Sequence, residues 1–270
     1  MSDDLMDFLC GADDAPVRPF YVPKVPELFR HAETLTVEHA RFGSLIFDRI
    51  QECDNGFLYW MRHAIPNKVF DAPEQLMVGR LTDGLYRQNH SDRAMYGSGN
   101  YEQSNIRQWA NSAEPAGRWY RPATIYDKPP HYRDEPGFLH GFPQEFLDRL
   151  RPALVPTRTN DMFETDVECG VLRECADFMF LPSFTEFTGK PNRGIPEGKQ
   201  WEPFVGLSDR ELFERLKKTD INGSAAWYWQ RSCIPGSPEY AGNVSVGGNP
   251  WSIDYAGYPL SGFAPACIIE

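Results

Sequence analysis

The chain has 270 residues, of which 41% are hydrophobic and 24% are charged, so its composition is that of a folded protein and excludes a disordered one. Its formal net charge of -11 excludes the basic surface that would attract nucleic acid or an anionic membrane. No run of about 18 apolar residues is present, which excludes insertion into a membrane as a spanning helix. The acidic start of the chain is unlike a secretory signal, so we expect a protein that is cytoplasmic as synthesised.

The cysteines and histidines do not form a recognisable metal-binding or disulfide pattern. No CxxC pair occurs among the six cysteines, and no two of the six histidines are spaced as HxxxH or HxH. Six cysteines in a chain of this length are also too few for a disulfide scaffold. We therefore expect reduced thiols, no metal site and no cofactor.

Residues 1–34 are expected to form an N-terminal arm outside the main domain. Residues 3–9 allow one or two amphipathic helical turns, which are too short to be stable alone. Residues 15–26 then place prolines between apolar residues, a pattern that favours an extended segment. The arm either clamps a neighbouring copy, which would give a homo-oligomer, or serves as a tether.

A β-hairpin is predicted at the start of the main domain. Residues 35–50 alternate imperfectly between apolar and polar side chains, and residues 57–61 form a second apolar run. The segment Asp54-Asn55-Gly56 lies between them, and Asn-Gly between two apolar runs is a strong signal for a hairpin turn.

Three helices are predicted further along the chain. One covers residues 98–112 with Asn100 as its cap, and a second covers residues 143–150 with a proline in its first turn. The third follows Ser208, which has Glu211 at the spacing of a capping box. The Asn222-Gly223 pair is expected to stop this third helix.

Two strands and one long loop complete the middle of the chain. The apolar runs at residues 153–157 and 178–183 predict strands. The proline-rich residues 112–141 are expected to be an insertion on the surface, because loops of this length are uncommon inside compact domains.

The last segment, Ala225 to Glu270, contains short aromatic runs separated by glycines and prolines. In the run W-Y-W-x-R, a strand would place Trp227 and Trp229 on one packed face and Tyr228 on the other, outward face. Tyrosine, serine, asparagine and tryptophan are the residues that adaptable binding surfaces use. The alternative, that the glycines and prolines only make tight turns and the aromatic residues form a core, remains open.

Four separated motifs resemble those of the DUF6273 family of bacterial and phage proteins. They are Arg41-Phe42-Gly43, Ser104–Asn111 (SNIRQWAN), Phe178–Glu186 (FMFLPSFTE) and Trp227–Ser232 (WYWQRS). The family is similar to the C-type lectin-like fold of formylglycine-generating enzymes and of diversity-generating-retroelement variable proteins. The resemblance covers roughly residues 36–270. Family members usually close with G-V-R-P-A, and this chain departs from that pattern with Gly262–Ala266 (GFAPA).

The resemblance implies one α+β domain over residues 35–270, of the C-type lectin-like type found in formylglycine-generating enzymes. Short mixed sheets, two to three helices and long loops are expected. Such a fold displays the segment before the last strand, so the ligand-facing region is expected at residues 225–262. The candidate ligand-binding residues are Tyr228, Gln230, Ser232, Tyr240, Asn243, Ser245, Asn249, Trp251, Asp254, Tyr255 and Tyr258.

The residues give no support for catalysis. Formylglycine-generating relatives hold copper with a pair of nearby cysteines, whereas Cys233 and Cys267 lie far apart in this sequence. The sequence Gly97–Asn100 (GSGN) is short for a phosphate loop, and Asp220, Asn222, Asn249 and Asp254 lack the triplets of calcium-binding lectins. We therefore expect no catalytic residues.

The function implied is that of a non-catalytic binding protein, which the resemblance suggests is a diversified phage or bacterial protein. Its partner is expected to be a protein or a glycan on a target surface, with no nucleic acid involved. Association with a virion is part of the same interpretation. Two alternatives stay open, a metal-dependent oxidase of the formylglycine-generating type and a structural subunit of a phage or envelope assembly. The step from fold to function is an analogy.

Overall fold

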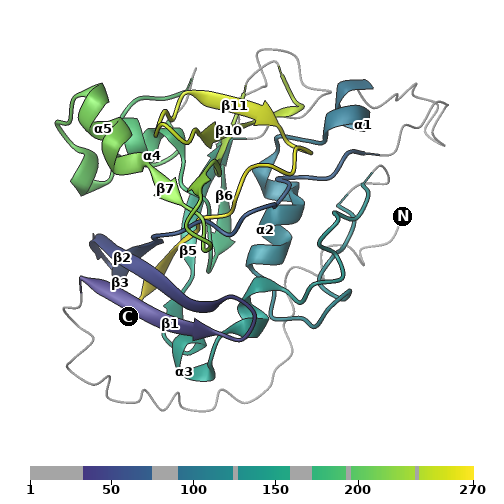
Figure 1. Ribbon diagram of the computed structural model, residues 1–270, viewed down its shortest axis with the longest axis horizontal. Coiled ribbons are helices and arrows are strands. Elements are labelled where there is room, and N and C mark those ends of the chain that lie inside the picture. The colour runs from purple at the N-terminus through teal and green to yellow at the C-terminus, as the bar shows by residue number, and fades with distance from the viewer. Residues whose placement is uncertain (1–32, 75–90, 124–126, 159–171, 193–195, 235–236) are drawn as a thin grey trace. The chain divides into compact units, whose positions relative to one another are not determined.

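The predicted hairpin forms the first strands of a five-stranded antiparallel sheet in the computed structural model (Figure 1). The structure describes residues 33–74, 91–123, 127–158, 172–192, 196–234 and 237–270. The strands of this sheet, in spatial order, are β1 (Thr34–His39), β2 (Gly43–Cys53), β3 (Gly56–Met61), β12 (Ala266–Ile269) and β4 (Leu150–Arg151). Cys53 pairs with Gly56, which confirms the predicted turn.

The apolar run at the C-terminus is a central strand of that sheet. Strand β12 lies between β3 and β4, so Ile269 pairs with Phe57 on one side and with Leu150 on the other. All four residues of β12 are buried. Gly56 makes this close pairing possible, because a Cβ atom there would collide with the backbone carbonyl of Ile269. The chain therefore ends inside its largest sheet.

A second, three-stranded sheet carries most of the C-terminal segment. Its strands are β11 (Ser252–Tyr255), β10 (Tyr240–Val244) and β9 (Tyr228–Cys233), in that order. Two small hairpin sheets join β5 (Ala153–Arg158) to β6 (Leu172–Asp177) and β7 (Lys218–Thr219) to β8 (Ala225–Ala226).

The prediction of mixed sheets is wrong for the described strands. Every pair of named strands is antiparallel. Parallel contacts in the described residues are limited to the isolated bridges between Ala64 and Asp220 and between Tyr228 and Gly262. The curled antiparallel sheet with a few short helices makes the chain an α+β protein, as predicted.

The α-helices of the described residues are short, with four to eight residues each. They are α1 (Ser91–Tyr96), α2 (Asn105–Ala110), α3 (Gln144–Leu147), α4 (Phe184–Thr188) and α5 (Asp209–Leu216). Single 3₁₀ turns are η3 (Tyr101–Gln103), η4 (Phe138–Gly141) and η5 (Glu202–Phe204). None of the described helices is long and apolar enough to cross a membrane.

Helix α5 begins as predicted, whereas the predicted cap of α2 is wrong. Ser208 accepts a hydrogen bond from the backbone N–H of Glu211, and Glu211 completes the capping box. Helix α2 starts after Ser104, which accepts from the N–H of Arg107, and Asn100 only precedes the 3₁₀ turn η3. Ser104 lies three residues before Arg107, which is the spacing of a helix cap, whereas Asn100 lies seven residues before Arg107 and is too distant in the chain to cap the helix.

Two other local predictions also fail, because residues distant in the sequence decide the structure. Asn222-Gly223 lies in the turn between β7 and β8, since α5 already ends at Leu216. Residues 178–183 form no strand of their own, although Phe180 makes an isolated bridge with Ala266 of β12. The backbone groups of residues 178–183 form single hydrogen bonds and not a continuous ladder with a neighbouring strand.

The proline-rich segment 112–141 contributes to the core, so its description as a surface insertion is wrong for its described residues. Trp119, Tyr132 and Phe138 are each at most 4% exposed and belong to the larger hydrophobic cluster. The rings of Trp119 and Tyr132 stack with centroids 5.7 Å apart. These buried aromatic side chains pack the segment against the body of the protein.

Residues 33–270 form one compact unit by their contacts. The predicted arm, residues 1–34, falls almost entirely outside the described residues, so its proposed role in oligomerisation remains a prediction.

Candidate functional site

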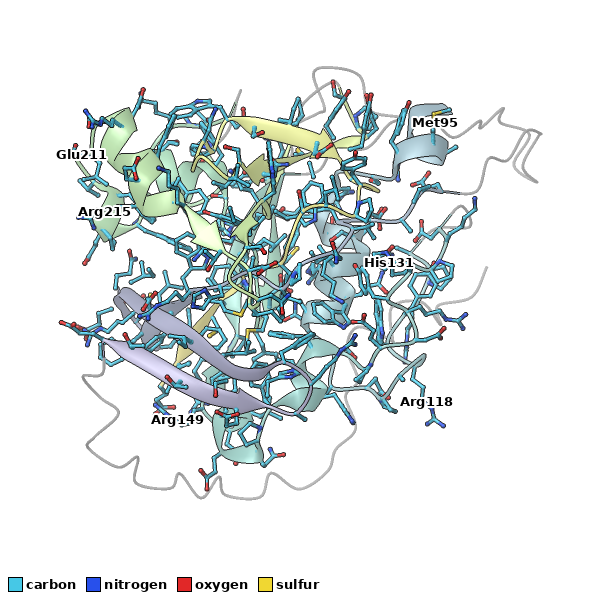
Figure 2. The ribbon with its side chains drawn as sticks, viewed as in Figure 1. Met95, Arg118, His131, Arg149, Glu211 and Arg215 are labelled. Atoms are coloured by element: carbon cyan, nitrogen blue, oxygen red, sulfur yellow. The ribbon has the colours of Figure 1, made fainter. Side chains whose placement is uncertain are left out.

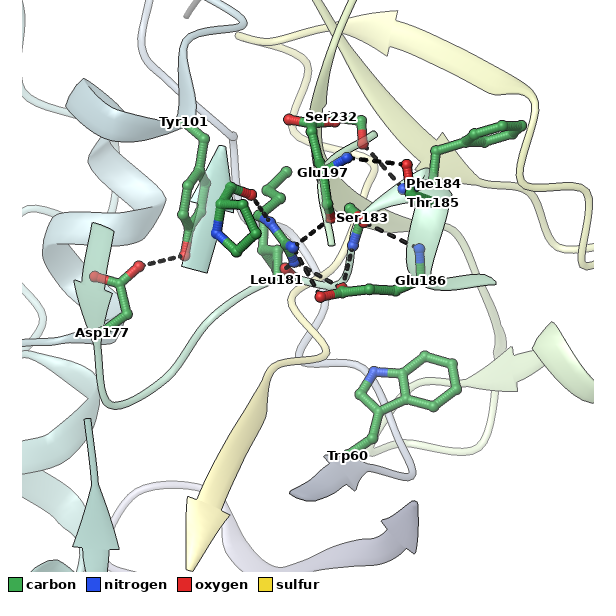
Figure 3. A network of polar contacts seen from close by, with 12 residues as sticks. Trp60, Tyr101, Asp177, Leu181, Ser183, Phe184, Thr185, Glu186, Glu197 and Ser232 are labelled. Carbon is green, nitrogen blue, oxygen red and sulfur yellow. Dashed lines mark hydrogen bonds and ion pairs between the residues drawn. The ribbon is translucent and has the colours of Figure 1, made fainter. Parts of the chain in front are cut away.

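The WYWQRS motif supplies the centre of a buried polar network (Figure 3). Arg231 in β9 is fully buried and forms two parallel hydrogen bonds, each of 2.7 Å, to the two carboxylate oxygens of Glu186. Its remaining N–H groups donate to the carbonyls of Pro156, Leu181 and Glu197 at 2.7 to 3.0 Å. Because every guanidinium N–H has an acceptor, this arginine joins four segments of the chain.

The FMFLPSFTE motif supplies the other half of this network. Ser183 caps α4 in a capping box with Glu186, and the Ser183 hydroxyl also donates to the carbonyl of Glu197 at 2.7 Å. The Glu197 carboxylate accepts from the backbone N–H of Arg158 at 2.9 Å, and burial raises its pKa. The network therefore holds α4, β5 and β9 together and leaves its charged groups no open face for a ligand.

The SNIRQWAN motif has the same structural character. Arg107 of α2 is bonded to Asp177 of β6 through Nε at 2.8 Å, and the hydroxyl of the buried Tyr101 donates to the same carboxylate at 3.1 Å. Asn111 donates to the carbonyl of Met179 and accepts from the N–H groups of Phe178 and Met179. The motifs that carry the family resemblance thus encode the framework of the fold.

The expected exposure of the C-terminal set is wrong for four of its members, because Tyr228, Gln230, Ser232 and Asn243 have no exposed surface. The Tyr228 hydroxyl donates to the carbonyl of Leu216 at 2.8 Å. Gln230 donates to two backbone carbonyls, and the Ser232 hydroxyl accepts from the N–H of Phe184 at 2.9 Å.

Strand β9 has no outward face because both of its faces and both of its edges are covered. Trp229 packs into one hydrophobic cluster and Tyr228 into the other. Beyond the pairing with β10, the N–H groups of Trp229 and Arg231 donate to the carbonyls of Gly262 and Pro182. The expectation that both indoles are packed is also wrong, since Trp227 is 37% exposed.

The other seven candidate residues lie on or near the surface. Trp251 and Tyr258 are exposed. The remaining five are half-buried: Tyr240, Ser245, Asn249, Asp254 and Tyr255. Trp251 lies against Phe184 and Phe213, so it belongs to the side of the sheet near α4 and α5.

Two of these residues take part in a stack of three tyrosines. The rings of Tyr96 and Tyr255 have centroids 3.8 Å apart with 15° between their planes, and Tyr240 stacks on Tyr255 at 4.5 Å and 24°. Tyr240 and Tyr255 are direct partners across β10 and β11, which places both rings on the same face of the sheet. The pKa of Tyr255 is raised mainly by its hydrogen bond with Tyr240, then by burial, and least by the nearby charge of Glu239.

A tight contact between α1 and the turn after β11 positions Tyr96, the third ring. The N–H of Gly257 donates to the carbonyl of Tyr96, and the next residue, Gly97, has φ of +84°. A Cβ atom at Gly97 would collide with the backbone of Asp71, so only glycine permits this approach. Tyr96 was not among the predicted site residues, since no periodic pattern or motif in the sequence marks it.

We define the tyrosine surface as the stacked residues Tyr96, Tyr240 and Tyr255 together with the exposed residues Met95, Ile253, Tyr258 and Leu260. Ile253 lies opposite Gly242, so no side chain on the neighbouring strand covers it. Met95 projects from α1 (Figure 2). The surface therefore combines α1, β10, β11 and the turn that follows β11.

Two buried or half-buried titratable side chains elsewhere, Asp71 and Lys218, form hydrogen bonds with backbone groups. Asp71 is almost fully buried, which raises its pKa well above the ordinary value, and its carboxylate accepts from the N–H of Asn105 at 3.0 Å. Burial lowers the pKa of Lys218 to about 7. Its Nζ lies 3.4 Å from the centroid of the Trp60 ring and donates to the carbonyl of Met61 at 2.6 Å, both of which favour the charged ammonium. Each group stabilises the strand or helix beside it.

The described residues contain no assembled metal centre. No group of three or more histidine, cysteine, aspartate and glutamate side chains among them is placed to hold a metal ion. Cys233 and Cys267 are both buried, in β9 and β12, which belong to different sheets. Burial raises the pKa of the Cys267 thiol, which disfavours the thiolate that a metal would bind.

The comparison with known families covers three of the four motifs, and Arg41-Phe42-Gly43 lies outside the matched residues. Residues 74–270 match the model of a domain of unknown function, DUF6273. No curated protein and no solved structure matches the chain. The family model covers well over half of the sequence and includes the buried network and the tyrosine surface. The chain therefore belongs to the DUF6273 family.

Proposed function

We propose that this protein is a non-catalytic binding protein and that the tyrosine surface is its ligand-facing site. The observation that carries the proposal is the stack of Tyr96, Tyr255 and Tyr240, held by two segments distant in the sequence and flanked by exposed apolar side chains. Stacked rings lose little conformational freedom when a partner binds, so they are effective anchors of an interface. An exposed apolar cluster of this kind is a feature of interaction sites.

The fold is proposed to be C-type lectin-like. The first and last described strands, β1 and β12, belong to the same sheet, and the segment before β12 forms a separate sheet that bears the tyrosine surface. This arrangement supports the comparison with lectin-like proteins, which present the segment before their last strand to ligands. We further propose that this is a diversified phage or bacterial protein carried on a virion. The genome sequence around its gene can test the diversification. A reverse transcriptase gene next to an imperfect copy of the codons for residues 226–262 is the expected neighbourhood.

The site is proposed to bind a protein or a glycan on a target surface. The test is selection of a phage-displayed library of random 12-residue peptides, together with an array of neutral and charged glycans. Both are probed with the native chain and with the double variant Tyr255→Ala, Tyr258→Ala. We expect ligands that bind the native chain and are lost with the variant.

The controls separate loss of the site from loss of the fold. The melting temperature of the double variant is compared with that of the native chain, and the single variant Tyr258→Ser, at an exposed position, serves where the double variant unfolds. If no peptide and no glycan distinguishes the native chain from both variants, the proposal is wrong. Loss of oligomers in light scattering without any effect on ligands would instead identify a structural subunit.

A further inference from the structure

The C-terminal part of the chain, which supplies most of the tyrosine surface, has an extreme distribution of charge. From Ser232 to Glu270 the sequence contains no lysine, arginine or histidine, while it contains the carboxylates Glu239, Asp254 and Glu270. Glu239 directly precedes β10 and lies close enough for its charge to act on Tyr255, whereas Asp254 alternates with Tyr255 along β11 and points to the opposite face of the sheet. The aromatic surface is therefore accompanied by negative charge alone within this segment.

Helix α1, which contributes Tyr96 and Met95, adds no available positive charge. Its one arginine, Arg93, is 7% exposed and is paired with the buried carboxylate of Glu74. Asp254 has one carboxylate oxygen engaged with the N–H of Tyr255 at 2.8 Å. Because Asp254 points to the opposite face of β11, Glu239 is the carboxylate of this segment that acts on the stack.

The free edge of β11 is blocked to a pairing strand at Tyr255. The N–H of Ala256 donates to the carbonyl of Glu239, so the backbone groups of Tyr255 point away from β10. The N–H of Tyr255 is taken by Asp254 and its carbonyl by the N–H of Tyr258 at 2.9 Å. Strand addition would therefore meet a blocked position, which is a common protection of edge strands. At this position a partner would meet side chains and not free backbone groups.

From these observations we infer that the partner of the tyrosine surface is a protein segment that presents arginine or lysine side chains. Guanidinium and ammonium groups stack on the faces of tyrosine rings and pair with carboxylates, and this surface offers both. The aliphatic stems of the same side chains would cover exposed Ile253 and Leu260. The inference rests on the proposed function, because it names the partner of the same site.

The composition of the selected peptides tests the inference. We expect the peptides that bind the native chain, and not the double variant, to be enriched in arginine and lysine. Peptides of neutral or acidic composition, or a glycan in their place, would overturn the inference and leave the proposed binding function standing. The absence of any ligand that depends on the tyrosines would overturn both.

A matched pair of charge variants distinguishes local recognition from attraction by the net charge of -11. Glu239→Gln removes the carboxylate whose charge acts on the stack, and Glu145→Gln removes an exposed carboxylate from α3, which lies at the other end of the ribbon from β11 (Figure 1). We expect Glu239→Gln to weaken binding of a selected peptide about tenfold and Glu145→Gln to change it less than about twofold. Equal effects of the two variants would show non-specific attraction and overturn the inference.

Discussion

Arg231 and Glu186 lie 45 residues apart in the sequence, yet their side chains form a two-pronged ion pair in the interior, with both contacts at 2.7 Å. Both residues are less than 10% exposed. Such a pair gives little net stability compared with an apolar pair of the same shape, but breaking it leaves an unpaired charge in the core. The pair therefore disfavours any packing of β9 against α4 that separates Arg231 from Glu186.

Glu186→Gln tests the contribution of the buried ion pair between Arg231 and Glu186. The variant keeps the size of the side chain and leaves the Arg231 charge unbalanced, so we expect a loss of about 3 to 5 kcal/mol in the free energy of unfolding. Urea denaturation measures it. Glu214→Gln is the matched control, since Glu214 forms an exposed pair with Lys217 and should contribute less than about 1 kcal/mol. Similar losses for the two variants would contradict this role of the buried pair.

The sequence predicts those elements whose signals are local. The turn at Asn55-Gly56 and the capping box of Ser208 and Glu211 are each specified by neighbouring residues, and the structure confirms both. The apolar C-terminal run is likewise a buried strand. Such signals do not depend on which distant segment packs nearby.

The burial of β9 and the position of Tyr96 could not be predicted in the same way. Alternation along the sequence assigns two faces to β9, but distant segments that contain Pro182 and Gly262 cover its remaining edge. Tyr96 is held at the site by the hydrogen bond from the N–H of Gly257, and Gly97 allows the end of α1 to lie close against the backbone of Asp71. Both outcomes depend on tertiary contacts, which override local pattern.

Gly141→Ala is expected to destabilise the fold. A Cβ atom at Gly141 would overlap the imidazole ring of His39, which is itself enclosed by Phe138 and Phe142. Because the ring has no room to move, we expect a loss of about 1 to 3 kcal/mol in urea denaturation. Gly247→Ala is the control, since its Cβ would meet only the Ser245 hydroxyl oxygen, at 3.6 Å. A change at Gly141 as small as that at Gly247 would rule out this packing argument.

His39 makes stability depend on pH. Its Nε2–H donates to the carbonyl of Phe138, and Nδ1 accepts from the N–H groups of Arg41 and Phe42, so the ring is held neutral. Burial, with a smaller effect of the Arg41 charge, lowers its pKa in the folded state. The unfolded chain takes up a proton near pH 6.5 and the folded chain only at lower pH. Stability is therefore lost as the pH falls below about 6.5.

The measurement is the free energy of unfolding at about pH 7.5 and about pH 5 for the native chain and for His39→Gln. We expect a smaller difference between the two pH values in the variant, because glutamine does not titrate. His63 acts in the same direction, since burial also lowers its pKa, and His63→Gln measures that share separately. An unchanged pH dependence in His39→Gln would refute the assignment.

Tyr228→Phe separates a framework residue from a ligand-binding one. The Tyr228 hydroxyl is buried and donates to the carbonyl of Leu216 at the end of α5, so its removal leaves that carbonyl without this donor. We expect a loss of about 0.5 to 1.5 kcal/mol in the free energy of unfolding and no change in binding of a selected peptide. The matched variant Tyr240→Phe alters the tyrosine surface and should weaken binding with little effect on stability. If Tyr228→Phe instead changes binding while stability stays constant, β9 contributes to the site despite its burial.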